Sequence, residues 1–90
     1  MSNTDPNARV LAIIDDNEQD LKELCLRLGN ARDYAGEELE VGEAVVQWLR
    51  EADIEARLQF ISETCVNAIG VLRGSGDREG GGRSLILNAH

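Results

Sequence analysis

The stretch IEARLQF, residues 54–60, is the point at which the spacing of apolar residues changes along the chain. Before it, apolar residues recur at intervals of three or four positions. Within it, apolar and polar residues alternate. Alternation is typical of a β-strand with one buried and one solvated face. The sequence therefore predicts helices before residue 54 and strands from there on.

Two further strands are predicted after this one. Residues 66–73, VNAIGVLR, form the second, and residues 84–88, SLILN, form the third. The third is apolar on both faces in its middle, as a central strand would be. Between them lies Gly74 to Arg83, a segment that holds five of the nine glycines. It lacks the Lys-Ser/Thr ending of a phosphate-binding loop and no helix follows it, so a hairpin connection is expected.

The first predicted helix runs from Ala8 to Leu28, where apolar residues follow the spacing of one buried stripe. Gly29 directly after it suits a left-handed C-terminal cap. The stripe consists of Val10, Ile13, Ile14, Leu21, Leu24, Cys25 and Leu28.

A second helix is predicted to start near Glu37, because acidic residues in a first turn suit the helix dipole. Gly42 is expected to weaken this helix slightly. Its apolar stripe consists of Val41, Val45, Trp48, Leu49 and Ala52. The expected fold class is thus α/β, with two helices packed on a small mixed or antiparallel sheet.

The composition limits the class of protein. The chain has 90 residues, enough for one small domain, and a net charge of −8. Such an acidic chain repels phosphate backbones and anionic membrane surfaces, so neither a nucleic acid nor a membrane is an expected partner. Cys25 and Cys65 are interpreted as buried thiols in a reducing compartment. Residues 1–7 form a polar, frayed lead-in without a secretory signal, and the expected location is cytoplasmic.

The apolar segment at residues 85–87 leads directly to His90, the one histidine. A domain rarely ends flush with its most buried strand, so we expect partners for this strand to come from further sequence or another chain. Side chains at the carboxyl ends of strands reach the ligand crevice in α/β sheets. Taken alone, one histidine is a weak indication of a metal site, because zinc takes three or four ligands.

The order of features from Cys65 to His90 resembles a family of zinc-dependent metallopeptidases and deacylases, which includes acetylornithine deacetylase, succinyl-diaminopimelate desuccinylase, aminoacylase and carboxypeptidase G-type enzymes. The matching features are the strand around Asn67, the turn at Arg73-Gly74 and the apolar strand that ends in Asn88-Ala89-His90. Upstream, the helix around Trp48 and the strand at residues 54–60 are similar to the family's first-domain elements. The resemblance covers the chain from about Val10 to His90.

This resemblance implies that residues 1–90 are the N-terminal portion of a larger α/β catalytic domain. The complete enzyme would cleave an N-acyl amide or peptide bond with zinc-activated water, on a small N-acyl amino acid or peptide. His90 aligns with a zinc ligand, and no catalytic residue is carried over. The family's other ligands and its general base have no counterpart here, so these 90 residues are expected to be inactive and to hold neither of the family's two zinc ions stably. A homodimer of the full-length protein stays open.

Two other functions are considered. The segment from Val10 to Glu18 resembles the first strand and acidic pair of receiver domains of response regulators, in which Asp15 and Asp16 would hold magnesium. A solvated helix face is preferred for these acids, because the apolar stripe continues in helical phase through them. The last hypothesis is a non-enzymatic acidic α/β interaction module that docks its bare strand on a partner.

Overall fold

The chain is a small α/β arrangement of helices and one antiparallel pair of strands, which confirms the predicted fold class. One helix packs on the strands, whereas the sequence predicts two. The structure is a computed structural model and describes residues 5–31, 38–75 and 82–90. Its elements are α1 (Pro6–Asp16), α2 (Glu18–Asn30), α3 (Leu39–Glu51), β1 (Glu55–Phe60) and β2 (Val66–Val71). The predicted start of a helix near Glu37, the center of the glycine-rich segment and the first four residues of the lead-in lie outside the described residues.

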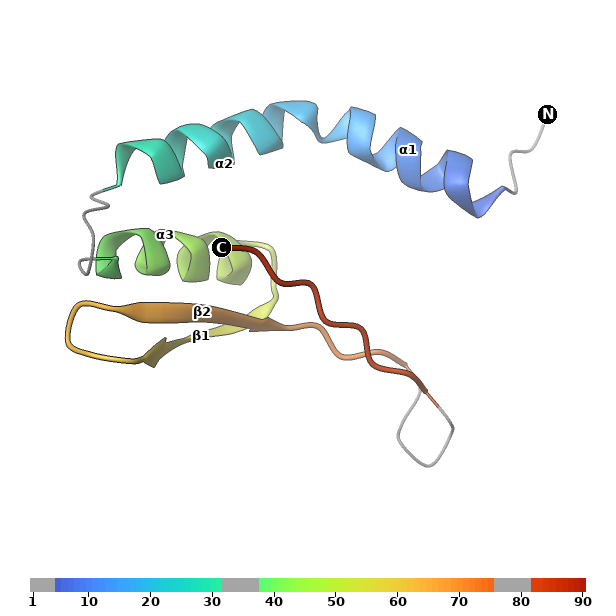
Figure 1. Cartoon of the computed structure of the whole chain (residues 1–90). Helices are drawn as coiled ribbons and strands as arrows, with labels where there is room; N and C mark the ends of the chain where they lie inside the picture. Colours follow the sequence, from blue (N-terminus) through green and yellow to red (C-terminus); the bar gives the residue numbers. More distant parts are fainter. Residues whose placement is uncertain (1–4, 32–37, 76–81) are drawn as a thin grey trace.

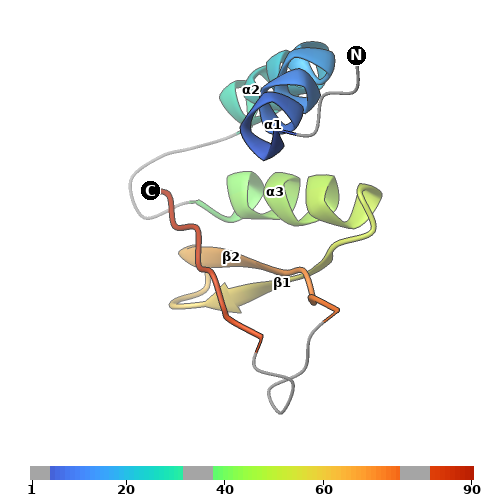
Figure 2. The same cartoon turned by 90° about the vertical axis from the view of Figure 1, so that its right-hand side faces the viewer.

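The elements form three layers, with α3 in the middle (Figures 1 and 2). One side of α3 contacts both strands, and α2 lies against its other side. Neither α1 nor α2 contacts the strands. None of the described helices is long and apolar enough to cross a lipid bilayer.

The single helix predicted for residues 8–28 is instead two helices, α1 and α2, which are divided at Asn17. The Asn17 side chain donates a hydrogen bond to the Ile13 carbonyl at 2.7 Å. An asparagine side chain that bonds to nearby backbone competes with the helical ladder, which explains the break. Gly29 lies within α2 and is not its cap, because the helix continues to Asn30 and Ala31 is the C-cap.

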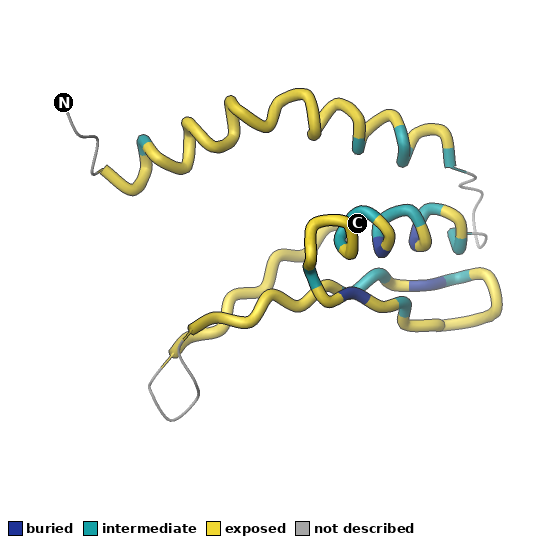
Figure 3. The backbone as a smooth tube through the Cα atoms, turned by 180° about the vertical axis from the view of Figure 1, so that it is seen from behind, coloured by how far each residue is buried: buried dark blue, intermediate teal, exposed yellow. Residues whose placement is uncertain are grey.

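The predicted buried stripe of the first helix is largely wrong. Val10, Ile13 and Ile14 are 55–58% exposed, because α1 contacts only α2 among the described elements. Leu24 and Leu28, which lie nearer α3, are half-buried. In Figure 3 the buried positions accordingly lie on α3 and the strands.

The core lies where α3 meets the sheet. Its buried apolar residues are Val46, Ala56 and Val66, each 6–8% exposed. Trp48 and Leu49 of the predicted α3 stripe are half-buried, whereas Ala52, at the C-cap, is exposed. Gly42 of α3 is also buried, and a Cβ at this position would meet side chains of both strands. The sequence pattern indicates this glycine only as a weak point of the helix.

The strands β1 and β2 pair in antiparallel register, with Ala56 opposite Gly70 and Phe60 opposite Val66. Their bounds agree closely with the predicted segments. The third predicted strand, residues 84–88, is not formed in the structure. A strand that is apolar on both faces needs cover on both sides, and the described elements cover only the face of the sheet that α3 contacts.

Replacing Gly42 by alanine is expected to destabilise the chain by about 1–2 kcal/mol, as measured by urea unfolding. An added Cβ would collide with Cγ2 of Val66 and lie 3.1 Å from Cδ2 of Leu58. Val66 is β-branched and buried, so it yields little, and α3 must move away from the sheet. This cost exceeds the gain of up to about 1 kcal/mol that alanine brings to a helix interior.

The matched control for this substitution is Gly29→Ala. A Cβ at Gly29 has open space within 4 Å, and the residue also lies in a helix. It is expected to stabilise the chain by up to about 1 kcal/mol. Equal stabilisation by both variants would contradict the close packing of α3 on β2.

Candidate functional site

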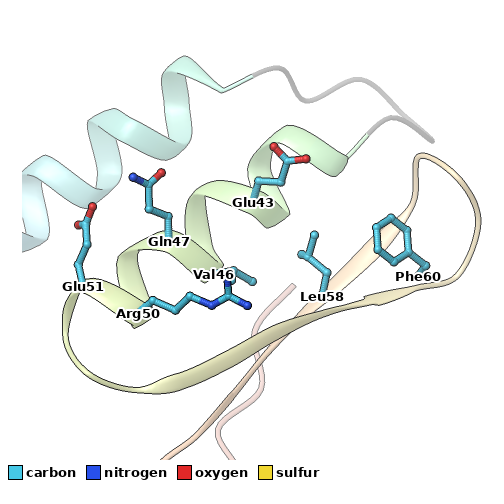
Figure 4. A pocket seen from close by; sticks show the side chains of 7 residues that line it. All are labelled: Glu43, Val46, Gln47, Arg50, Glu51, Leu58 and Phe60. Carbon is cyan, nitrogen blue, oxygen red and sulfur yellow. The ribbon is translucent and has the colours of Figure 1, made fainter.

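A groove of about 640 Å³ runs between α3 and β1 (Figure 4). Helical spacing places its α3 residues on one side of the helix, and strand alternation places Leu58 and Phe60 on one face of β1. The lining residues are Glu43, Val46, Gln47, Arg50, Glu51, Leu58 and Phe60. The groove is therefore apolar along its floor and polar along its α3 rim.

Arg50 is the residue of the groove with the most specific contacts. Its Nε and Nη2 both donate to the carbonyl oxygen of Ala56, at 3.1 and 2.9 Å. The tight connection between α3 and β1 allows Arg50 to reach Ala56. In this connection Asp53 adopts a left-handed conformation with φ of 60°. The amide of Ile54 then donates to the Leu49 carbonyl at 2.9 Å. This turn brings Ala56 back beside the last turn of α3.

Arg27 of α2 contacts the C-terminal end of α3 on the side that faces α2. Its Nη1 lies 3.3 Å from Oε2 of Glu51, and its guanidinium carbon lies 5.1 Å from the centroid of the Trp48 ring. A cation over an indole is attractive. These contacts fix α2 against α3 and engage Glu51 at the rim of the groove.

The groove does not have the donor set of a metal site. Among the residues that the structure describes, no three His, Cys, Asp or Glu side chains are grouped so that they could hold a metal ion. The carboxylates at the rim, Glu43 and Glu51, come with an amide and a guanidinium rather than a histidine or a thiolate.

His90, the predicted zinc ligand, is exposed at the end of the described segment 82–90. The apolar residues before it, Leu85 to Leu87, are 83–88% exposed. Because residues 84–88 are not part of the sheet, the structure does not bring His90 to a sheet end. Its role as a zinc ligand stays a prediction.

Asp15 and Asp16 lie at the C-terminal end of α1 and are exposed. The preceding residues, Val10 to Ile14, are helical. The receiver-domain alternative requires these residues to form a central strand with the acids at its end. That strand is not formed, so the acidic pair lies on a solvated helix, as preferred from the sequence.

The two cysteines differ from each other. Cys25, in α2, is exposed, so its prediction as a buried thiol is wrong. Cys65 is half-buried, and its Sγ lies 3.5 Å from Oε2 of Glu38. The hydrogen bond to Glu38, followed by burial and the negative charge of Glu38, raises the pKa of the Cys65 thiol. Since zinc binding and nucleophilic attack need the thiolate, this environment disfavours both at Cys65.

Comparisons with known proteins do not add to these observations: no family model, no curated protein and no solved structure matches the chain.

Sequence reasoning missed Arg50 and the groove. The signal that could have identified Arg50 is its position in the last turn of the helix, six residues before Ala56 in the next strand. A long side chain there can reach back to a strand that returns along the helix. The sequence did not indicate which strand edge it would contact.

Proposed function

We propose that these 90 residues form the N-terminal part of a zinc-dependent amide hydrolase, in which His90 is one zinc ligand. The observation that carries this proposal is the order of motifs in the sequence. A strand with Asn67 is followed by Arg73-Gly74, a glycine-rich segment and an apolar run that ends in Asn88-Ala89-His90. The substrate class that follows is an N-acyl amino acid or a peptide, and the free cysteines favour a cytoplasmic location.

The amount of exposed surface supports a role as one part of a larger fold. The solvent-accessible surface is 8150 Å², whereas a compact protein of 9.9 kDa exposes about 5200 Å². The radius of gyration is 16.3 Å, compared with about 12 Å for a compact chain of this length. The excess surface includes apolar residues of α1 and the segment from Leu85 to Leu87. Further protein packed on these residues would remove them from water.

The described residues do not form a zinc site by themselves, because His90 is not grouped with other potential ligands. Zinc takes three or four protein ligands at a structural or catalytic site. In this proposal the other ligands and the general base come from outside the 90 residues. We therefore assign no catalytic step to the residues of this chain, and its role is to present His90 and to support the sheet.

The proposal is tested on a polypeptide in which these residues are followed by the rest of the proposed catalytic domain. We expect bound zinc by elemental analysis and hydrolysis of N-acetyl amino acids. Removal of the metal with a chelator should abolish hydrolysis, and added zinc should restore it. A metal-free protein, or hydrolysis that persists through chelation, would contradict the proposal.

A second function, an acidic interaction module, is favoured by the exposed apolar residues on α1. Val10, Ile13 and Ile14 are each more than half exposed and share one face of α1 by their helical spacing, and an exposed apolar face of this kind is typical of an interaction surface. Sedimentation of the 90-residue chain separates the two functions. A monodisperse monomer or dimer favours the module, and aggregation favours a part of a larger catalytic domain.

A further inference from the structure

Each strand of the sheet has an outer edge, at which the amide and carbonyl groups of alternate residues point away from the other strand. The amide of Ile61 donates to the Cys65 carbonyl at 2.9 Å, so these two residues, which directly follow β1 and precede β2, occupy a hydrogen-bonded position of the ladder. Hydrogen-bonded and non-hydrogen-bonded pairs alternate along an antiparallel ladder. In this register the backbone groups of Ala56 and Leu58 therefore point away from β2. The same alternation turns the backbone groups of Ala68 and Gly70 away from β1.

The outer edge of β1 is occupied by a side chain. Arg50 donates twice to the outward carbonyl of Ala56, at 3.1 and 2.9 Å. A carbonyl oxygen has two lone pairs, and the two donors of the guanidinium use both. An added strand would need this carbonyl as an acceptor, and its backbone would have to displace the guanidinium. Charged side chains at a strand edge are a known protection against such pairing.

The outer edge of β2 has no such protection among the described residues. No described side chain donates to or accepts from the outward backbone groups of Ala68 or Gly70. The strands also differ on the face that α3 does not cover. There β1 presents Glu55, Arg57 and Gln59, whereas β2 presents Asn67, Ile69 and Val71, so the face of β2 is the less polar of the two. A polar second face is typical of an edge strand, and an apolar one is typical of an interior strand.

We propose that Arg50 closes the outer edge of β1 to strand addition by a second copy of this chain. This inference does not depend on the proposed function. It assigns to the Arg50 side chain the protection of the β1 edge. The side chain can do this because the left-handed Asp53 returns β1 directly beneath the last turn of α3. In Figure 4 the Arg50 side chain extends from α3, and its guanidinium is the group that donates to Ala56 of β1.

The test compares the 90-residue chain with its Arg50→Ala variant at increasing concentration, by sedimentation velocity and residue-resolved amide hydrogen exchange. In the unmodified chain, the outward amide of Leu58 should exchange without protection, even where the chain self-associates. In Arg50→Ala, a second copy can pair with β1. Exchange at Leu58 should then slow by about tenfold or more as concentration rises.

Two variants control for charge and for folding. Arg57→Ala removes the same charge from the opposite face of β1 and should leave exchange at Leu58 unchanged. Arg50→Lys keeps the charge but not the forked donors, so it should show a weaker form of the alanine effect. The amide of Ile69, which points towards β1, reports that the strands remain paired. If Arg50→Ala loses the protection of the Ile69 amide, its strands are no longer paired. The exchange rate of Leu58 in Arg50→Lys then decides the test.

The inference is overturned by either of two results. One is protection of Leu58 in the associated, unmodified chain, which would mean that Arg50 does not close the edge. The other is an unprotected Leu58 in both Arg50 variants at every concentration while Ile69 stays protected. An equal effect of Arg57→Ala would show that charge, and not the contact with Ala56, decides the pairing, and would also overturn it.

Discussion

If the proposed function holds, the His90→Ala variant of the complete protein is expected to lose bound zinc and to hydrolyse N-acyl amino acids at least about a hundredfold more slowly. Loss of an outer-shell partner of a metal ligand already costs about 10–100-fold, and loss of the ligand itself should cost more. His90 is the one histidine among the 90 residues, so no other imidazole of this segment can replace it. A missing ligand leaves zinc with an incomplete coordination shell, and its affinity falls. Elemental analysis and an amide-hydrolysis assay measure the two effects separately.

The control for His90→Ala is Cys65→Ala, which removes another residue of a zinc-binding type. The thiol of Cys65 contacts Glu38, and its raised pKa disfavours the thiolate. This variant should retain zinc and activity. If His90→Ala keeps its zinc content and its rate, the assignment of His90 fails. If Cys65→Ala loses zinc, the ligand set is different from the one proposed.

The parts of the fold that could be predicted from the sequence are those set by local spacing. The alternation in residues 54–60 gave β1, and the run from Val66 gave β2, because each pattern is contained in one element. The division at Asn17 was not predicted. A stripe of apolar residues runs through it in phase, and the hydrogen bond from the Asn17 side chain to Ile13 is a local competition that periodicity does not detect.

The core and the groove depend on contacts between elements, which a single sequence pattern does not specify. Gly42 was interpreted from its helix propensity alone, yet its missing side chain allows α3 to lie against Val66. Residues 84–88 have the pattern of a central strand, but a strand also needs neighbours and cover. The chain supplies cover on one face of the sheet only, so the pattern is present without the strand.

Replacing Ile86 by aspartate is expected to destabilise the complete protein of the proposed function by about 3 kcal/mol or more, because the carboxylate would be buried without a partner. In the 90-residue chain the same change should alter the free energy of unfolding by less than about 0.5 kcal/mol. Ile86 is 85% exposed there, so its replacement removes almost no contact. Urea unfolding of both proteins gives the two values.

The conservative variant Ile86→Val separates charge from shape. In the complete protein it should cost about 1 kcal/mol, the usual effect of removing one buried methylene. Together the two variants test whether the apolar run before His90 becomes a buried strand when more of the protein is present. Equal stability of the Ile86→Asp variant and the unmodified complete protein would mean that this run stays in water. His90 would then not be carried to a metal site by a buried strand, and the structural basis of the proposed function would be lost.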